Sequence, residues 1–270
     1  MEIRNIWRRT ALFRHELISA FFPPVCRHCQ AGYEAPAASV HFRECLDRFP
    51  DLHFPELAAP YLCETCRQDG EERIRRHPEA EGRSLLVLPS GGAVSLVSGG
   101  VYTGALRNAI HGLKYQGHTW PVPPLGLLLL AVFVRSGLAG TADMILPMPL
   151  HIRRFRKRGF NQAYLPLRFW RKIAADAGLA LSPNLIRRDI LFRTAERPPQ
   201  VKLHQEERRA NVAGIFSVRK QADLAGSRVV LADDVVTTGA TSGECAEVLL
   251  RAGAVSVSVL VMARTPREPE

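Results

Sequence analysis

Residues 228–241 constrain the fold of this chain more than any other segment. They read RVVLADDVVTTGAT, an apolar and β-branched run that leads into two aspartates and then into a turn rich in threonine and glycine. This order predicts a buried strand at 228–232 and, after the turn, a helix at 242–251. In open α/β sheets, ligands bind in the crevice beyond the carboxyl ends of the strands. We therefore expect a ligand crevice where this strand ends.

Strand and helix patterns alternate along most of the remaining chain. Apolar runs at 85–88 and 94–97 are separated by Pro-Ser-Gly-Gly, which predicts a hairpin. Further predicted strands are 144–148 and 255–262, and further predicted helices are 102–114 and 162–177, the last closed by Gly178. Such alternation is typical of an α/β fold with a mostly parallel twisted sheet and flanking helices.

The acidic pair and the turn after it have complementary chemistry. Asp233 and Asp234 only accept hydrogen bonds when ionised, so they suit sugar hydroxyls, which donate them. The turn offers backbone N–H groups, threonine hydroxyls and the positive end of a helix, which together suit a phosphate. Its residues are Thr237, Thr238, Gly239, Ala240 and Thr241, and we expect Gly239 to let the backbone approach a phosphate oxygen. The segment thus indicates a phosphorylated sugar, with an exposed acidic turn capping the helix as the alternative.

This stretch closely resembles the diphosphate-sugar signature of type I phosphoribosyltransferases. The resemblance implies that Asp233 and Asp234 hold the ribose 2- and 3-hydroxyls and that residues 237–241 hold the 5-phosphate. Ala232 departs slightly from the pattern, in which a larger apolar residue is usual before the acids. In transferases of this superfamily, Mg²⁺ neutralises the departing diphosphate, so the resemblance also implies Mg²⁺ with a bound diphosphate.

Three further segments resemble the ComF/GntX branch, the competence-associated phosphoribosyltransferase-like proteins. They are GVYTGALRNAIHGLKYQG at 100–117, LPMPLHIRRFRKRGFNQAYL at 146–165 and RTAERPPQVKLHQEERRANVAGIF at 193–216. The similarity covers most of residues 84–264. It implies a protein that binds phosphoribosyl diphosphate and has a role in DNA uptake and natural transformation, with single-stranded DNA or competence proteins as candidate partners.

Two alternatives remain open at this point. The chain is either an active phosphoribosyltransferase that moves ribose 5-phosphate to an unknown nitrogen acceptor, or an accessory protein that keeps the fold and the ligand. A third and weaker hypothesis is a zinc-dependent nucleic-acid binder with a relic pocket. No catalytic base can be named from the sequence.

A basic loop and a polar segment provide the remaining ligand candidates. Arg158, Gly159, Asn161 and Gln162 follow the strand at 144–148, and arginine side chains pair well with diphosphate oxygens. Lys114 is a second candidate cation, with a surface lysine as the alternative. Residues 193–211 contain few apolar positions and predict a mobile flap that closes over substrate. The branch's repeated polar positions in this flap correspond to Gln200, Arg208 and Asn211.

Two CxxC pairs precede the α/β pattern. Cys26, Cys29, Cys63 and Cys66 have the pair spacing of a four-thiolate structural zinc site. A short segment with little core would gain its fold from the metal. Substitute ligands would be Cys45, His28 or His41, and the alternative to a metal site is a set of free thiols. We expect Cys245 to be a small buried residue.

Charge and hydropathy narrow the class of protein. The net charge of +10 and the pI near 9.8 favour anionic partners such as phosphates, nucleic acid or an acidic membrane surface. The longest apolar run, 125–134, is far shorter than the ~20 residues of a membrane helix, and we find no secretory signal. We therefore expect a cytoplasmic protein, and the sequence leaves its oligomeric state open.

These patterns divide the chain into three parts. Residues 1–24 would form an amphipathic helix, residues 25–83 a Cys-rich zinc module with its linker, and residues 84–266 the phosphoribosyltransferase-like domain. The helix would either bind a membrane surface or a partner, or pack onto the rest of the protein.

Overall fold

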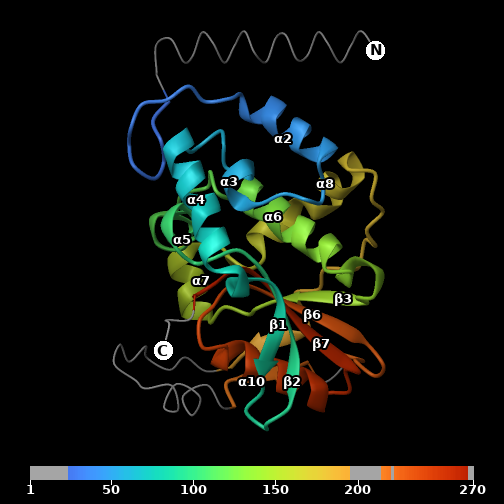
Figure 1. Ribbon diagram of the computed structural model, residues 1–270. Coiled ribbons are helices and arrows are strands. Elements are labelled where there is room, and N and C mark those ends of the chain that lie inside the picture. Colours follow the sequence, from blue (N-terminus) through green and yellow to red (C-terminus); the bar gives the residue numbers. More distant parts are fainter. Residues whose placement is uncertain (1–23, 195–213, 220–221, 267–270) are drawn as a thin grey trace, which may run out of the picture.

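The structure is a computed structural model that describes residues 24–194, 214–219 and 222–266 (Figure 1). The expected helix at 1–24 therefore lies almost entirely outside the described residues. Most of the expected flap at 193–211 lies outside them too, including Gln200, Arg208 and Asn211.

The centre of the fold is a mixed sheet of five strands in the order β1-β2-β7-β6-β3. The first two strands form an antiparallel hairpin, and the other three neighbouring pairs are parallel. The strand bounds are β1 Glu81–Val87, β2 Ala93–Gly99, β3 Met144–Pro147, β6 Arg228–Val236 and β7 Ser256–Arg264. A second antiparallel pair joins β4 (Leu191–Arg193) to β5 (Phe216–Val218). The expectation of an α/β fold with a mostly parallel sheet is confirmed.

Helices cover both faces of the sheet (Figure 1). The described helices are α2 Ala38–Asp47, α3 Phe54–Leu57, α4 Glu64–Arg76, α5 Gly104–Gln116, α6 Val122–Arg135, α7 Ile152–Arg158, α8 Trp170–Asp176 and α10 Ala240–Arg251. Short 3₁₀ turns lie at Pro78–Ala80, Leu138–Gly140 and Leu165–Phe169. Among them, α6 packs on one face against β2 and β7, and α10 packs on the other face against β6 and β7. No helix in the described residues is long and apolar enough to cross a membrane.

The strand sequences explain why the sheet has two covered faces. Side chains alternate between the faces of a strand, so a strand buried on both sides must be apolar at nearly every position. In β6, Val229 and Leu231 join the core beneath α10, whereas Val230 and Ala232 join the core beneath α6. The acids come directly after this run and are themselves buried.

Two expected elements differ from the structure. The helix expected at 162–177 is instead a 3₁₀ turn followed by α8, because Pro166 has no N–H to donate and fixes its own backbone angle. Strand β6 continues past Ala232 to Val236, because Val235 and Val236 pair with Ala263 and Arg264 of β7. The acids therefore lie in the later part of β6, which pairs with β7 but no longer with β3.

The Cys-rich segment packs directly on the α/β part. Its buried Leu52, Leu57 and Leu62 belong to the same hydrophobic core as the inner faces of α5 and α6. The segment therefore contributes to a core, whereas the sequence predicted a segment with little core that would gain its fold from the metal. In addition, β1 begins at Glu81, so the expected boundary between residues 83 and 84 falls inside a strand.

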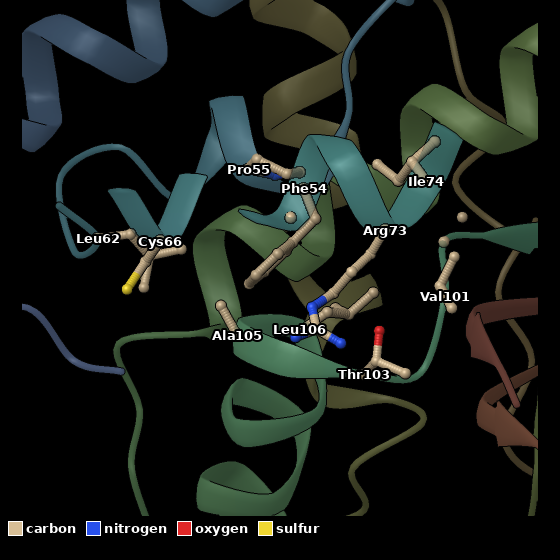
Figure 2. Close-up of a pocket in the computed structure, with 13 residues that line it drawn as sticks. Phe54, Pro55, Leu62, Cys66, Arg73, Ile74, Val101, Thr103, Ala105 and Leu106 are labelled. Carbon is tan, nitrogen blue, oxygen red and sulfur yellow. The ribbon is translucent and has the colours of Figure 1, made fainter. Parts of the chain in front are cut away.

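Figure 2 shows how tightly this seam is filled. Phe54 and Arg73 from α3 and α4 reach toward Thr103 and Leu106 at the start of α5, and the cavity that remains is only about 20 Å³. Arg135, the last residue of α6, donates hydrogen bonds to the carbonyls of Pro50 and Leu52 at 3.2 and 3.0 Å. The two parts are thus joined by apolar packing and by directed hydrogen bonds.

Candidate functional site

The acidic pair lies on β6 just beyond the residues that pair with β3. The pairing with β3 ends at Pro147 and Ala232, and the Met148 N–H then donates to the Ala232 carbonyl at 2.7 Å. Beyond this point Asp233 is paired only with Val261 of β7. The side of β6 that β3 leaves open is therefore the place where a ligand can approach the acids.

Lys114 neutralises part of the acidic pair. This lysine belongs to the last turn of α5, and its Nζ lies 2.6 Å from Oδ1 of Asp234. Burial by itself would lower the pKa of Lys114, but the charge and the hydrogen bond of Asp234 outweigh it and raise that pKa. The sequence named Lys114 and Asp234 separately, and the structure brings them together.

Asp233 is in a different electrostatic state. Burial, and next the charge of Asp234, raise the pKa of Asp233 to about 8, against the opposing charge of Lys114. The Asp234 N–H donates to Oδ1 of Asp233 at 2.8 Å. The pair therefore holds one lysine-bound carboxylate beside one carboxyl group that retains its proton near neutral pH.

The acids do not face open solvent. Asp233 is 8% and Asp234 4% exposed. Oδ2 of Asp234 is buried and has no hydrogen-bond partner within the described residues. Since a buried acceptor without a partner is costly, this oxygen is suited to a donor that is supplied from outside the described chain.

The threonine turn follows the acids at once and leads into α10. Gly239 has a φ of +78°, in the left-handed region, and a Cβ there would overlap Cδ1 of Leu86 on β1. The reason we expected for this glycine is therefore incomplete, because its φ and the nearby Leu86 side chain both favour a residue without a Cβ. Within the described chain, the hydroxyls of Thr237, Thr238 and Thr241 make no hydrogen bond.

Arg158, the last residue of α7, lies near the acidic pair. Burial lowers the pKa of Arg158, and the charge of Asp234 opposes this shift, so the two groups lie within electrostatic reach. Its guanidinium hydrogen-bonds with Oε1 of buried Gln162 and lies over the ring of Tyr115, 5.4 Å from the centroid. Tyr115 was not identified from the sequence, and its position next to Lys114 was the only available signal.

Gly159 and Asn161 shape the loop rather than point at the acids. Gly159 ends α7 with a φ of +83°, which a glycine adopts without strain. Asn161 donates through Nδ2 to the Met148 carbonyl at 3.0 Å and accepts from the Ala163 N–H at 2.8 Å. Its side chain thereby fastens the basic loop to the end of β3.

Sequence reasoning also missed two buried acids on α10. Glu244 accepts a hydrogen bond from the Gly214 N–H at 2.8 Å, and Glu247 accepts one from the Ser90 N–H. They connect α10 to the start of β5 and to the turn of the hairpin. A helix of ordinary amphipathic pattern gives no signal for such contacts.

The four CxxC cysteines form one cluster. The Sγ atoms of Cys26, Cys29, Cys63 and Cys66 all lie within 4.8 Å of one another, and those of Cys29 and Cys63 are 3.6 Å apart. Zn–S bonds of ~2.3 Å in a tetrahedron place the sulfurs about 3.8 Å apart, so the spacing suits zinc. Burial opposes thiolate formation at Cys26, but hydrogen bonds from the backbone at Cys29, Cys63 and His28 lower its pKa to about 6.

The substitute ligands considered from the sequence are engaged elsewhere. Nε2 of His41 lies 2.8 Å from the Glu56 carbonyl and 3.4 Å from Sγ of Cys45. His28 contacts Asn108 of α5, with 2.7 Å between Nδ1 and Nδ2. Cys245 is fully buried, as expected, and its Sγ lies 3.4 Å from the sulfur of Met148.

Comparison with known proteins identifies the family. The "DNA utilization protein YhgH" of Salmonella typhi is 34% identical over 220 residues, which cover 76% of this chain and 90% of that protein. The "Competence protein F" of Haemophilus influenzae is 31% identical over 237 residues, or 82% of this chain and 96% of that protein. The chain belongs to the ComF family.

Other comparisons are less informative for this ComF-family chain. No protein-family model matches it. Among solved structures, that of the protein TT1426 from Thermus thermophilus has a TM-score of 0.28 and 14% sequence identity, and the match covers 54% of this chain and 84% of that one.

Proposed function

We propose that this ComF-family chain binds a phosphoribosyl diphosphate at the acidic pair and the threonine turn, and that it serves DNA uptake or utilisation. The observation that carries the ligand assignment is Oδ2 of Asp234, a buried acceptor without a partner in the described residues, beside Lys114 and just before the turn. A ribose hydroxyl is a donor that would satisfy it. The proposal includes the type I phosphoribosyltransferase fold for residues 84–266 and a cytoplasmic location, the latter supported by the six free thiols.

Different groups around the acids would bind different parts of the ligand. Asp234 and Asp233 would take the ribose hydroxyls, and the N-terminus of α10 with the unbonded threonine hydroxyls would take the 5-phosphate. Lys114 and Arg158 are the cations that would face the diphosphate. Mg²⁺ would neutralise the diphosphate charge through phosphate oxygens and waters, so the protein needs no carboxylate cage for it.

A bound diphosphate would compete with Asp234 for Lys114. The ion pair at 2.6 Å closes the acids in the structure described. A diphosphate offers Lys114 a second anionic partner, while the ribose hydroxyl donates to Oδ2 of Asp234. The exchange leaves Lys114 paired with the diphosphate and leaves the Asp234 carboxylate hydrogen-bonded to a hydroxyl donor.

The DNA-related part of the proposal rests on the relatives. The Salmonella typhi protein is named for DNA utilisation and the Haemophilus influenzae protein for competence. The net charge of +10 agrees with a polyanionic partner.

Zinc held by the four cysteines would be structural, because four thiolates leave no open coordination position.

Isothermal titration of the full chain with phosphoribosyl diphosphate and Mg²⁺ tests the ligand assignment. We expect saturable binding to the wild type and a loss of at least roughly tenfold in affinity for Asp234→Asn. The control is Asp143→Asn, which removes an exposed carboxylate paired with Arg228 at the other end of β3. Equal affinity of the wild type and Asp234→Asn, or no binding by the wild type, would refute the assignment.

Transferase activity is the alternative function, and the intact acids and turn favour keeping it. Release of diphosphate from the bound ligand in the presence of ammonia or a free base would establish it. Binding without release would assign the chain to the accessory role.

A further inference from the structure

An apolar groove lies between α2 and α8, with α6 at its base. It has a volume of about 630 Å³, and its lining includes Phe42, Leu46, Leu127, Phe169 and Ile173. Figure 1 shows these helices on one side of the sheet and α10 on the other. The groove is separate from the acidic pair, because none of the described residues that line it belongs to β6, α5 or the threonine turn.

Each wall of the groove is one face of a helix. On α2 the lining residues are Ser39, Phe42, Arg43 and Leu46, and the other wall repeats this spacing from Phe169, the N-cap of α8, to Asp176. Such i, i+3, i+4, i+7 spacing is typical of a helix face that packs against another element. Phe42 and Leu46 are only half-buried and Phe169 is 48% exposed, so the described residues leave both faces partly uncovered.

The segment that precedes the described chain has a matching pattern. Residues 1–23 lie outside the described residues, and their sequence predicts an amphipathic helix. Phe13, Leu17 and Phe21 recur at intervals of four, so a helix would align them in one apolar stripe about 12 Å long. The two groove walls, at residues 39–46 and 169–176, are each about 10 Å long by the same rise per residue. The stripe therefore fits the groove in length and in chemistry.

The point where this segment joins the described chain lies near the α2 wall. Pro24 is separated from Arg27 by at most about 10 Å of extended chain. The Arg27 N–H donates to the Tyr61 carbonyl at 2.8 Å, and the ring centroid of Tyr61 lies 6.4 Å from that of Phe42. A segment tethered this close has an effective concentration on the order of millimolar, which favours it over a free partner.

The charges of the groove and the segment are complementary. Arg43 and Lys172 line the groove, and neither has an acidic partner within the described chain. Asp176 also belongs to the lining. In the segment, Glu16 and Arg14 would lie on opposite sides of the apolar stripe, because their helical positions flank it. Opposite charges on the two flanks can pair with both signs at the rim, which sets orientation more than affinity.

We propose that residues 1–23 dock as a helix in this groove of the same chain, with Phe13, Leu17 and Phe21 against its apolar lining. An isolated helix of about fifteen residues is marginal in water, so the groove would supply most of its stability. The proposal is independent of the phosphoribosyl diphosphate site and of any DNA partner.

Amide hydrogen exchange of the full chain, read at residues 13–21, tests the docking. We expect these amides to be protected in the wild type. Leu17→Ser and Phe169→Ser should each accelerate their exchange by roughly tenfold or more, because each removes an apolar contact that holds the docked state. The double variant should exchange little faster than either single variant, because both changes remove the same contact.

The chain offers a matched control for each variant. Leu12→Ser changes a leucine of the segment that falls outside the stripe by helical spacing. Phe155→Ser removes a phenylalanine of similar exposure, 43%, from α7 and outside the groove. Both controls should exchange within about twofold of the wild type. Equal acceleration in the control and groove variants would overturn the proposal.

Other occupants of the groove predict different results. Acceleration by Leu17→Ser without acceleration by Phe169→Ser would place the segment elsewhere and overturn the proposal, and so would a wild type without protection. Protection that rises with protein concentration, together with a dimeric mass by light scattering, would assign the groove to a second copy. Protection that requires anionic phosphatidylglycerol vesicles would assign the segment to a membrane surface. Protection in dilute protein without vesicles supports docking within the chain.

Discussion

At the scale of single residues, the acidic pair stores an electrostatic cost. Two buried carboxyl groups are adjacent in β6, and one lysine from α5 balances only one of them. The raised pKa of Asp233 lets it keep its proton near neutral pH, which removes the repulsion between two adjacent carboxylates. An ordinary surface turn would not maintain such an arrangement, because solvent would screen both charges. The cost is consistent with a site that awaits a ligand with hydroxyl donors.

The raised pKa of Asp233 predicts how stability depends on pH. The unfolded chain releases this proton near pH 4 and the folded chain near pH 8, so the folded state binds more protons between these values. The free energy of unfolding should therefore fall as pH rises from about 5 to 8.5, by on the order of 2–5 kcal/mol. Asp233→Asn should lose this dependence. Urea unfolding of both proteins at several pH values provides the measurement.

The control for this experiment is Asp143→Asn. Its partner Arg228 lowers the pKa of Asp143 to about 2, so that group titrates below the window. The control should keep the wild-type slope. If Asp233→Asn and the wild type gave parallel curves, Asp233 would be ionised in the folded protein throughout.

At the scale of elements, α5 connects the cysteine cluster to the acids. Asn108 contacts His28 between the cysteines of the first pair, and Lys114 follows six residues later, about 9 Å further along the helix axis. Gly104 at the start of α5 has a φ of +50°, and a Cβ there would lie 3.0 Å from Nε of Arg73. The Cys-rich segment therefore lies against α5 at Gly104 and again at Asn108.

This arrangement predicts that loss of zinc from the four cysteines would weaken binding at the proposed phosphoribosyl diphosphate site. Cys63→Ser should lose one zinc per chain by metal analysis, because the four thiolates supply all the ligands. Amide exchange in α5 should then accelerate, and affinity for phosphoribosyl diphosphate should fall severalfold. Cys45→Ser is the control, since its sulfur contacts His41 outside the cluster. A zinc-free variant with unchanged exchange in α5 would contradict the connection.

At the scale of the whole molecule, the Cys-rich segment and the sheet share one core. Leu62 lies next to Cys63, yet it is buried among residues that also contact α5 and α6. His53 and Arg135 converge on Glu81 at 2.7 and 3.3 Å, so an ion-pair network spans the same seam. Two parts that bury each other's apolar surface are expected to unfold together.

Leu62→Ala tests this cooperativity. The variant should lower the free energy of unfolding by about 2–5 kcal/mol, because it leaves a cavity in a filled core. Far-UV circular dichroism and tryptophan fluorescence should still report one coincident transition, since Trp170 is buried in the shared core. Leu85→Ala, at a side chain 69% exposed, should change stability by less than about 0.5 kcal/mol. Two separated transitions would show independent domains.

The sequence by itself determined the parts that depend on local pattern. The apolar run before Asp233, the turn after it and the closing helix follow from side-chain alternation and from the signals that start a helix. The CxxC spacing likewise indicated the four clustered cysteines, because two residues between thiols place both on one metal. These features span short stretches of chain, where neighbouring residues decide the conformation.

Only the tertiary structure decided which distant groups meet. Nothing near Asp234 in the sequence signals Lys114, which lies 120 positions earlier and reaches it because α5 packs beside the strand end. Leu86 of the hairpin lies where a Cβ at residue 239 would be, and the segment expected to form a separate zinc module shares the main core. Such contacts depend on how apolar faces fit together in space, and that fit is a property of the whole packed chain.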